Sequence, residues 1–154
     1  MSPSTQIVDI FRKKLADLEE ALEVPLVAGE LTAWTSRVAN SARIVHSVLT
    51  EHLAQAHRED FATMAQQDLE MATCIDNMKA EDATIRLESE HFMELASNVA
   101  AAATRAEPDE LALEKAREHL VDRGLALVLR IRKQEAAVRT WYIEAFQRDR
   151  GVGD

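Results

Sequence analysis

The chain has 154 residues, which is enough for one folded domain with a sizeable hydrophobic core. An apolar fraction of 47% and a charged fraction of 29% are typical of a globular protein and exclude a disordered one. The net charge of −9 argues against a nucleic-acid binder and against binding to an anionic membrane surface, because both activities need a basic face.

No apolar run approaches the roughly 20 residues of a membrane span, and the N-terminus lacks the apolar core of a signal peptide. The lone cysteine, Cys74, cannot form an internal disulfide. We therefore expect a cytoplasmic protein. Only four glycines and three prolines interrupt a sequence rich in Ala, Leu, Glu and Arg, which are strong helix formers, so we predict an all-α fold.

Apolar residues at helical spacing predict a first helix over residues 4–23, which Pro25 and Gly29 bring to an end. A second stripe predicts a helix over residues 30–57. No glycine or proline ends this helix, so we place its stop at the polar cluster His57–Asp60, with a loose connection within residues 58–67.

A third helix is predicted over residues 66–106, either continuous or broken near Lys79–Asp82. Pro108, followed by acidic residues, predicts the start of a last helix over residues 109–148, and the tail 149–154 is expected to fray. Short connections favour antiparallel neighbours. We therefore predict that residues 1–154 form a single domain, an antiparallel up-down-up-down four-helix bundle.

Histidines and carboxylates on the apolar stripes are the candidate site residues, because a bundle core can build a metal site from facing helices. His52 lies on the inward stripe of the second helix. His57 follows five positions later, which in a regular α-helix turns it by about 140° from His52. We therefore expect the two histidines to face different ways, with His57 at the solvated end of the helix.

Two further segments carry candidate ligands. Glu88 and His91 have the Glu-x-x-His spacing of di-iron carboxylate bundles, which puts both side chains on one side of a helix. Glu135 and Gln134 interrupt the apolar stripe of the last helix, and a carboxylate that points into the core needs a histidine, an arginine or a cation as partner. The predicted metal ligands are His52, Glu88, His91 and Glu135, and no catalytic residue is predicted.

The last helix and tail, from Gln134-Glu135-Ala136-Ala137-Val138 through Trp141–Phe146 to Gly151-Val152-Gly153-Asp154, resemble the C-terminal end of bacterial hemerythrin-like (HHE) domains. Leu49-Thr50-Glu51-His52 resembles the second helix of that family, and Glu90–Leu95 resembles the third. The resemblance implies an antiparallel four-helix bundle with a non-haem di-iron site that binds oxygen or senses iron and redox state.

The ligand pattern that this resemblance implies is incomplete here. The family's second helix reads His-x-x-x-Glu, whereas His52 is followed by Ala56. The third helix reads His-x-x-x-His, but His91 has leucines at both offsets, and the last helix has Gln134 where a histidine is expected. Two of about seven ligand positions, His52 and His91, carry over, so non-haem iron remains a cofactor implied by the resemblance alone.

Three hypotheses follow for the function. The first is a hemerythrin-like bundle whose di-iron site is lost or remodelled and which acts as a non-catalytic binding or sensing module. The second is a functional non-haem iron protein with a carboxylate-rich site. The third is a structural or interaction bundle, either a homodimer or a module that binds a protein partner, and its contact surface would be Trp34 or the basic face of the last helix. The alternative interpretation of that basic face is a solvated surface whose cations pair with acidic neighbours.

Overall fold

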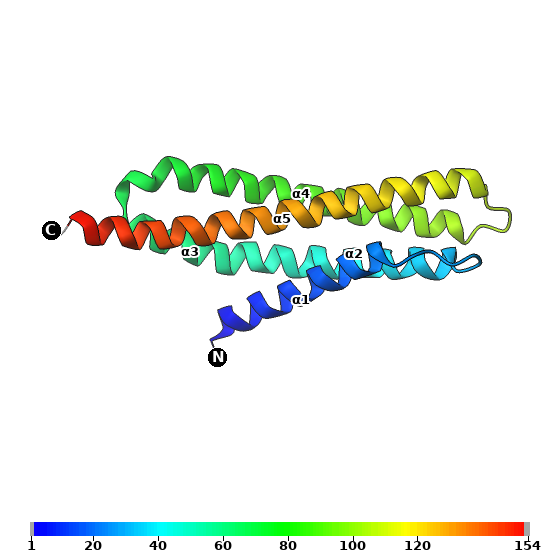
Figure 1. Ribbon diagram of the computed structural model, residues 1–154, viewed down its shortest axis with the longest axis horizontal. Helices are drawn as coiled ribbons and strands as arrows, with labels where there is room; N and C mark the ends of the chain where they lie inside the picture. The colour runs from blue at the N-terminus through cyan, green and yellow to red at the C-terminus, as the bar shows by residue number, and fades with distance from the viewer. Residues whose placement is uncertain (1, 153–154) are drawn as a thin grey trace.

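The computed structural model describes residues 2–152, and within that range it contains helices and no strand. Figure 1 shows the elements in chain order. They are α1 (Pro3–Glu23), α2 (Leu31–His52), the π-helical turn η1 (Leu53–His57), α3 (Arg58–Gln67), the 3₁₀ turn η2 (Leu69–Met71), α4 (Ala72–Ala103) and α5 (Glu110–Val152). The prediction of an all-α fold is confirmed.

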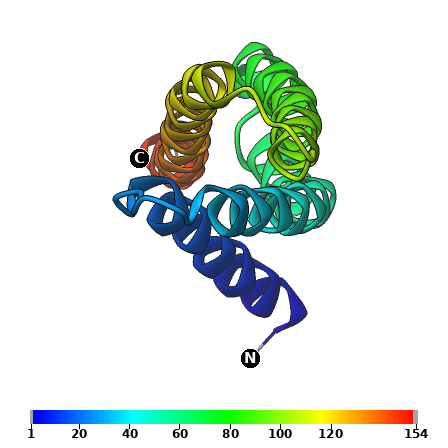
Figure 2. The ribbon, with the colours of Figure 1, turned by 90° about the vertical axis from the view of Figure 1, so that its right-hand side faces the viewer.

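Four helical rods pack around a shared core, because α2, η1 and α3 form one continuous rod. This rod packs against α1 and α4, and α5 packs against α4, α3 and α1. The connections 24–30 and 104–109 lie at one end of the molecule and the turn before α4 lies at the other end (Figure 1). Viewed along the bundle, the N-terminal part of α1 leans away from the other helices (Figure 2).

Two clusters of buried apolar side chains fill the bundle. The main core draws on α1, α2, α4 and α5, and it includes the fully buried Phe11, Leu18 and Val38. The end core lies between α3, α4 and α5 and includes Phe61 and Met64. Each fully buried large apolar side chain contributes about 1.5–3 kcal/mol, so these clusters hold the helices that carry the polar residues described below.

The predicted stop of the second helix at His57–Asp60 is wrong. The backbone remains helical through Gln67, because the exposed Arg58 and Glu59 lie on the outer side of α3 while Phe61 and Met64 continue the buried stripe. Asp68, in an extended conformation, ends the rod.

The third and last helices also differ from their predicted bounds. After the η2 turn, α4 runs without a break through Lys79–Asp82 and ends at Ala103. The last helix, α5, extends to Val152, so the tail predicted to fray is helical up to that residue, and residues 153–154 lie outside the described part of the chain.

Two surface predictions have different outcomes. Trp34 is only 6% exposed and its indole N–H donates to the Ala21 carbonyl at 2.9 Å, so it is a core residue and not the exposed dimer contact that we considered. Arg130 pairs with Glu81 and Glu88 on α4, as expected for a solvated face with acidic neighbours. Within residues 2–152, no helix is long and apolar enough to cross a membrane.

Candidate metal centre

The π-helical turn η1 is the backbone feature that builds the site. In a π-helix the hydrogen bonds join residues five apart, so side chains at i and i+5 lie on one face instead of about 140° apart. His52 and His57 bracket this turn, and their ring centroids lie 4.7 Å apart in an edge-to-face arrangement. Both residues are 1% exposed. The prediction that they face different ways, with His57 in solvent, is wrong because it assumed a regular α-helix.

Glu135 of α5 joins the two histidines. Its Oε1 atom lies 2.9 Å from His52 Nε2 and 2.6 Å from His57 Nε2. Burial raises the pKa of Glu135, but the hydrogen bond with His52, the close contact with His57 and the charge of both rings outweigh burial and lower it to about 2. The carboxylate is therefore ionised at neutral pH and faces two imidazole nitrogens.

The carboxylate of Asp82 fixes the orientation of the His57 ring through its Nδ1 atom. His57 Nδ1 lies 2.7 Å from Asp82 Oδ2, and Gln134 Nε2 donates to Asp82 Oδ1 at 2.8 Å. Gln134 also donates to the Met78 carbonyl at 3.0 Å, which holds the amide in place. When His57 Nδ1–H donates to Asp82, the Nε2 atom of a neutral His57 presents its lone pair toward Glu135. Histidines that bind metals are usually oriented in this way.

The protonation of His57 follows from its two acidic neighbours. Burial lowers the pKa of His57, but the hydrogen bond with Asp82, the close contact with Glu135 and the charge of both carboxylates outweigh burial and raise it to about 9. Without a bound cation, His57 is therefore an imidazolium between two carboxylates at neutral pH. A divalent ion at Nε2 would replace that proton, because a metal binds the neutral form of imidazole.

Two buried ring nitrogens have no hydrogen-bond partner among the described residues. They are His52 Nδ1 and His57 Nε2. His57 Nε2 is close to Glu135 Oε1, but the contact does not have the direction of a hydrogen bond, so we treat it as an electrostatic contact. An unsatisfied buried polar atom costs about 1–3 kcal/mol, which the fold tolerates most readily where the atom serves a function.

Aromatic rings wall the site on both sides. Phe11 of α1 stacks on His52 with ring centroids 4.4 Å apart, and Phe61 of α3 lies 5.6 Å from His57. Asp60 lies at the border. Its burial raises its pKa, the positive charge of His57 opposes this rise, and the negative charge of Glu135 adds to it. These neighbours exclude water and strengthen electrostatic interactions within the site.

The donor set of His52, His57 and Glu135 fits a single divalent cation. One ligand atom from each residue lies within 4.8 Å of the other two. Two imidazoles with one carboxylate suit Zn²⁺ and Fe²⁺ and leave coordination positions open. This is the one group of three potential ligands in the described part of the chain, so the residues present do not fit the two-iron cluster that the family resemblance implies.

The structure brings together two of the four predicted ligands. His52 and Glu135 meet in the core, whereas Glu88 is half-buried and pairs with Arg130, and His91 is exposed on α4. The inward residue of that segment is Ser89, whose Oγ lies 2.7 Å from His46 Nδ1. The Glu-x-x-His spacing therefore runs along the outer side of α4, away from His52.

Sequence reasoning missed His57 and Asp82. Asp82 had a readable signal, because Met78, Asp82 and Ile85 are spaced as one stripe of a helix and all three are buried. His57 had a fainter one: Phe61 and Met64 follow it by four and seven positions, so the apolar stripe resumes one residue out of step with Ala56. Comparisons with models of protein families, with curated proteins and with solved structures gave no match to this chain. The interpretation of the site therefore depends on its geometry.

Proposed function

We propose that this chain is a hemerythrin-like, antiparallel up-and-down helical bundle whose two-iron site has been remodelled into a site for one divalent metal ion. It would act as a non-catalytic metal-binding or metal-sensing module in the cytoplasm, without a nucleic-acid partner. The connections at alternate ends of the bundle support the topology (Figure 1). The negative net charge argues against binding to nucleic acid.

The observation that carries this proposal is the meeting of His52, His57 and Glu135 around a π-helical turn. The turn absorbs one extra residue. His57 therefore points where the fourth residue after His52 would point in a regular α-helix. In the hemerythrin-like pattern that fourth residue is a ligand, so His57 takes the place that Ala56 leaves without one.

Asp82 supports the proposal independently of the resemblance. A carboxylate that accepts the Nδ1–H of a buried histidine raises the basicity of the other nitrogen and fixes the ring. An ion pair alone would not need the aligned chain from Gln134 through Asp82 and His57 to Glu135. This series of contacts orients His57 Nε2 toward the Glu135 carboxylate on α5, and a metal site requires ligand atoms oriented in this way.

Calorimetry on chelator-treated protein tests the proposal. We expect Zn²⁺, or Fe²⁺ without oxygen, to bind with a stoichiometry of one. At a free concentration of about 100 times Kd, the ion would raise the unfolding free energy by about 2.7 kcal/mol. For a chain of this length that is roughly 5–10 °C in Tm. His57→Ala should reduce the rise at the same free metal concentration, whereas the matched variant His91→Ala, at an exposed histidine, should retain it. An unchanged Tm for the wild-type protein would refute the proposal.

Iron-based oxygen or redox sensing is the second candidate. It is favoured by the donor set, because two histidines and one carboxylate are the ligands of many mononuclear Fe²⁺ sites with open positions. Anaerobic titration with Fe²⁺, followed by exposure to air, would test it. A change in the optical spectrum that requires His52 supports this candidate, and air oxidation at the rate of free Fe²⁺ in buffer counts against it.

A further inference from the structure

A cleft borders Asp82, the residue that orients His57. It is about 360 Å³ in volume and opens between the rod formed by α2, η1 and α3 and the facing helix α4. Ligand sites for small molecules start at about 300 Å³. The cleft is lined by Thr50, Leu53, Ala54, Arg58, Phe61, Lys79, Asp82, Ala83 and Arg86.

Three cationic side chains converge on this cleft. Arg58 comes from α3, and Lys79 and Arg86 come from α4. None of the three forms an ion pair with an acidic residue in the described part of the chain, unlike Arg130 and Arg132, which pair with glutamates of neighbouring helices. In a chain with a net charge of −9, three unpaired cations around one hollow create a local field that attracts anions.

The floor of the cleft is apolar and its one carboxylate is already engaged. Phe61, Leu53 and the methyl groups of Ala54 and Ala83 supply the apolar surface. Asp82 is 8% exposed, and its two oxygens accept from His57 and Gln134. Its charge is therefore compensated within the core and does not repel an anion at the rim.

We propose that this cleft binds a small organic anion, in which an acidic group is attached to an apolar body. The apolar body would lie against Phe61 and Leu53, and the acidic group would accept hydrogen bonds from Arg58, Lys79 and Arg86. This site is separate from the metal centre and does not depend on it. The two sites share Asp82, which contacts His57 and lines the cleft, and Phe61, whose ring lies 5.6 Å from His57 and also lines the cleft.

Binding of three probes to chelator-treated protein tests the cleft separately from the metal site. Naphthalene-2-sulfonate carries both the charge and the apolar body, 2-naphthol lacks the charge, and inorganic sulfate lacks the apolar body. We expect one molecule of naphthalene-2-sulfonate to bind per chain. Each of the other two probes should bind at least about tenfold more weakly, because 2-naphthol loses the charged hydrogen bonds and sulfate loses the burial of the apolar body.

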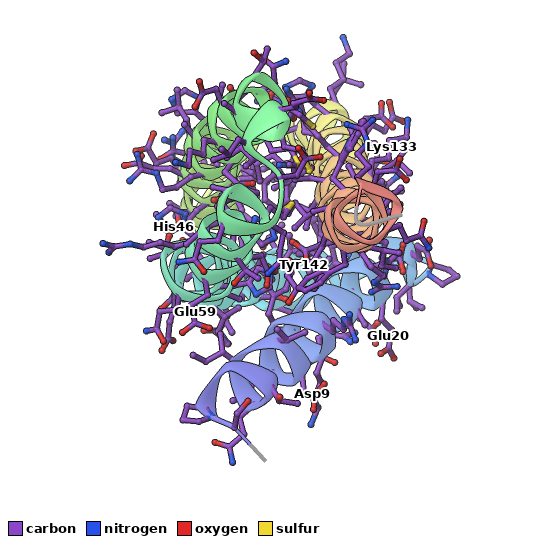
Figure 3. All side chains as sticks on the ribbon, turned by 90° about the vertical axis from the view of Figure 1, so that its left-hand side faces the viewer. Asp9, Glu20, His46, Glu59, Lys133 and Tyr142 are labelled. Atoms are coloured by element: carbon purple, nitrogen blue, oxygen red, sulfur yellow. The ribbon has the colours of Figure 1, made fainter. Side chains whose placement is uncertain are left out.

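Variants assign the binding to the cleft. Arg86→Gln and Lys79→Gln should each weaken naphthalene-2-sulfonate binding by about tenfold. Both side chains are exposed, so their melting temperatures should match that of the wild-type protein. Lys133→Gln is the matched control, because Lys133 is an exposed side chain of α5 that does not line the cleft (Figure 3). Equal binding by the Arg86 and Lys79 variants and the wild-type protein, or no saturable binding of the sulfonate, would overturn the proposal.

Discussion

Replacing Asp82 by asparagine tests how the metal centre is oriented. Asp82 accepts two hydrogen bonds, from His57 Nδ1 at 2.7 Å and from Gln134 Nε2 at 2.8 Å. An asparagine of the same shape has one acceptor and one donor group, so it cannot accept both bonds. Its NH₂ group must face either the NH₂ of Gln134 or the Nδ1 atom of His57.

Either arrangement weakens metal binding. If the asparagine donates to His57 Nδ1, the ring proton of a neutral His57 moves to Nε2, the atom that should bind the metal. If it faces Gln134 instead, two donors oppose each other in the core. Loss of a carboxylate that supports a metal-binding histidine typically costs 10–100-fold in affinity, or about 1.4–2.8 kcal/mol. We expect a loss of this size for Zn²⁺.

The assay is calorimetric titration of Zn²⁺ into wild-type and Asp82→Asn protein, together with the pKa of His57 from the NMR shifts of its ring protons. In the variant that pKa should fall below the value of about 9 that Asp82 and Glu135 maintain. Asp76→Asn, at an exposed position earlier on the same helix, is the control. Equal Zn²⁺ affinity and an unchanged pKa of His57 in Asp82→Asn would refute this reasoning.

Four further predictions concern pH and the π-helical turn. Without metal, the raised pKa of His57 contributes on the order of 3 kcal/mol to the free energy of unfolding. This contribution is fully present below pH 6.5 and is lost as the pH rises through about 9. Urea titrations of the wild-type protein and His57→Ala across this pH range measure it. The lowered pKa of Glu135 contributes stability above pH 4.5 that is lost as the pH falls toward about 2, and Glu135→Gln should flatten that acid limb. Zn²⁺ affinity should rise about tenfold for each pH unit up to about 9, because binding releases the His57 proton; a titration that releases no proton to the buffer contradicts this. Deleting the exposed Gln55 should restore a regular α-helix in which the two histidines still share one face, so the protein should still bind Zn²⁺. Deleting the exposed Ala62 in α3 is the control, because it should turn the residues after it by about 100° and lower Tm. Loss of Zn²⁺ binding on deleting Gln55 would contradict the assigned role of the π-helical turn.

The apolar periodicity allowed the all-α fold and the inward position of His52 to be predicted, whereas for Glu135 it left both an inward position and a solvated edge open. The fold class and the position of His52 are consequences of the α-helical repeat, which the sequence displays directly. The apolar stripe of the third predicted helix, α4, includes Ile85 and Phe92, and Ser89 lies between them at helical spacing; Ser89 and Phe92 are buried while His91 is exposed. The apolar stripe of α4 therefore predicts which of its side chains face the core better than the Glu-x-x-His spacing does.

We did not predict the position of His57, because it depends on a local change of helix type that displaces the buried stripe by one residue. A single π-helical turn shifts the later side chains by the angle of one residue, yet the buried stripe resumes at Phe61 and Met64. The helix termini were missed for a related reason. Tertiary packing against α5 continues the rod past the polar residues 58–60, and local composition does not report that packing (Figure 3).

The most direct test of the proposed metal centre is X-ray absorption at the zinc edge of protein loaded with one equivalent of Zn²⁺. We expect two imidazole nitrogens at about 2.0–2.1 Å and carboxylate or water oxygen at about 2.0–2.2 Å. One imidazole should be lost in each of His52→Ala and His57→Ala, and neither in His91→Ala. A zinc environment with fewer than two imidazoles, or one that His57→Ala leaves unchanged, would contradict the proposal.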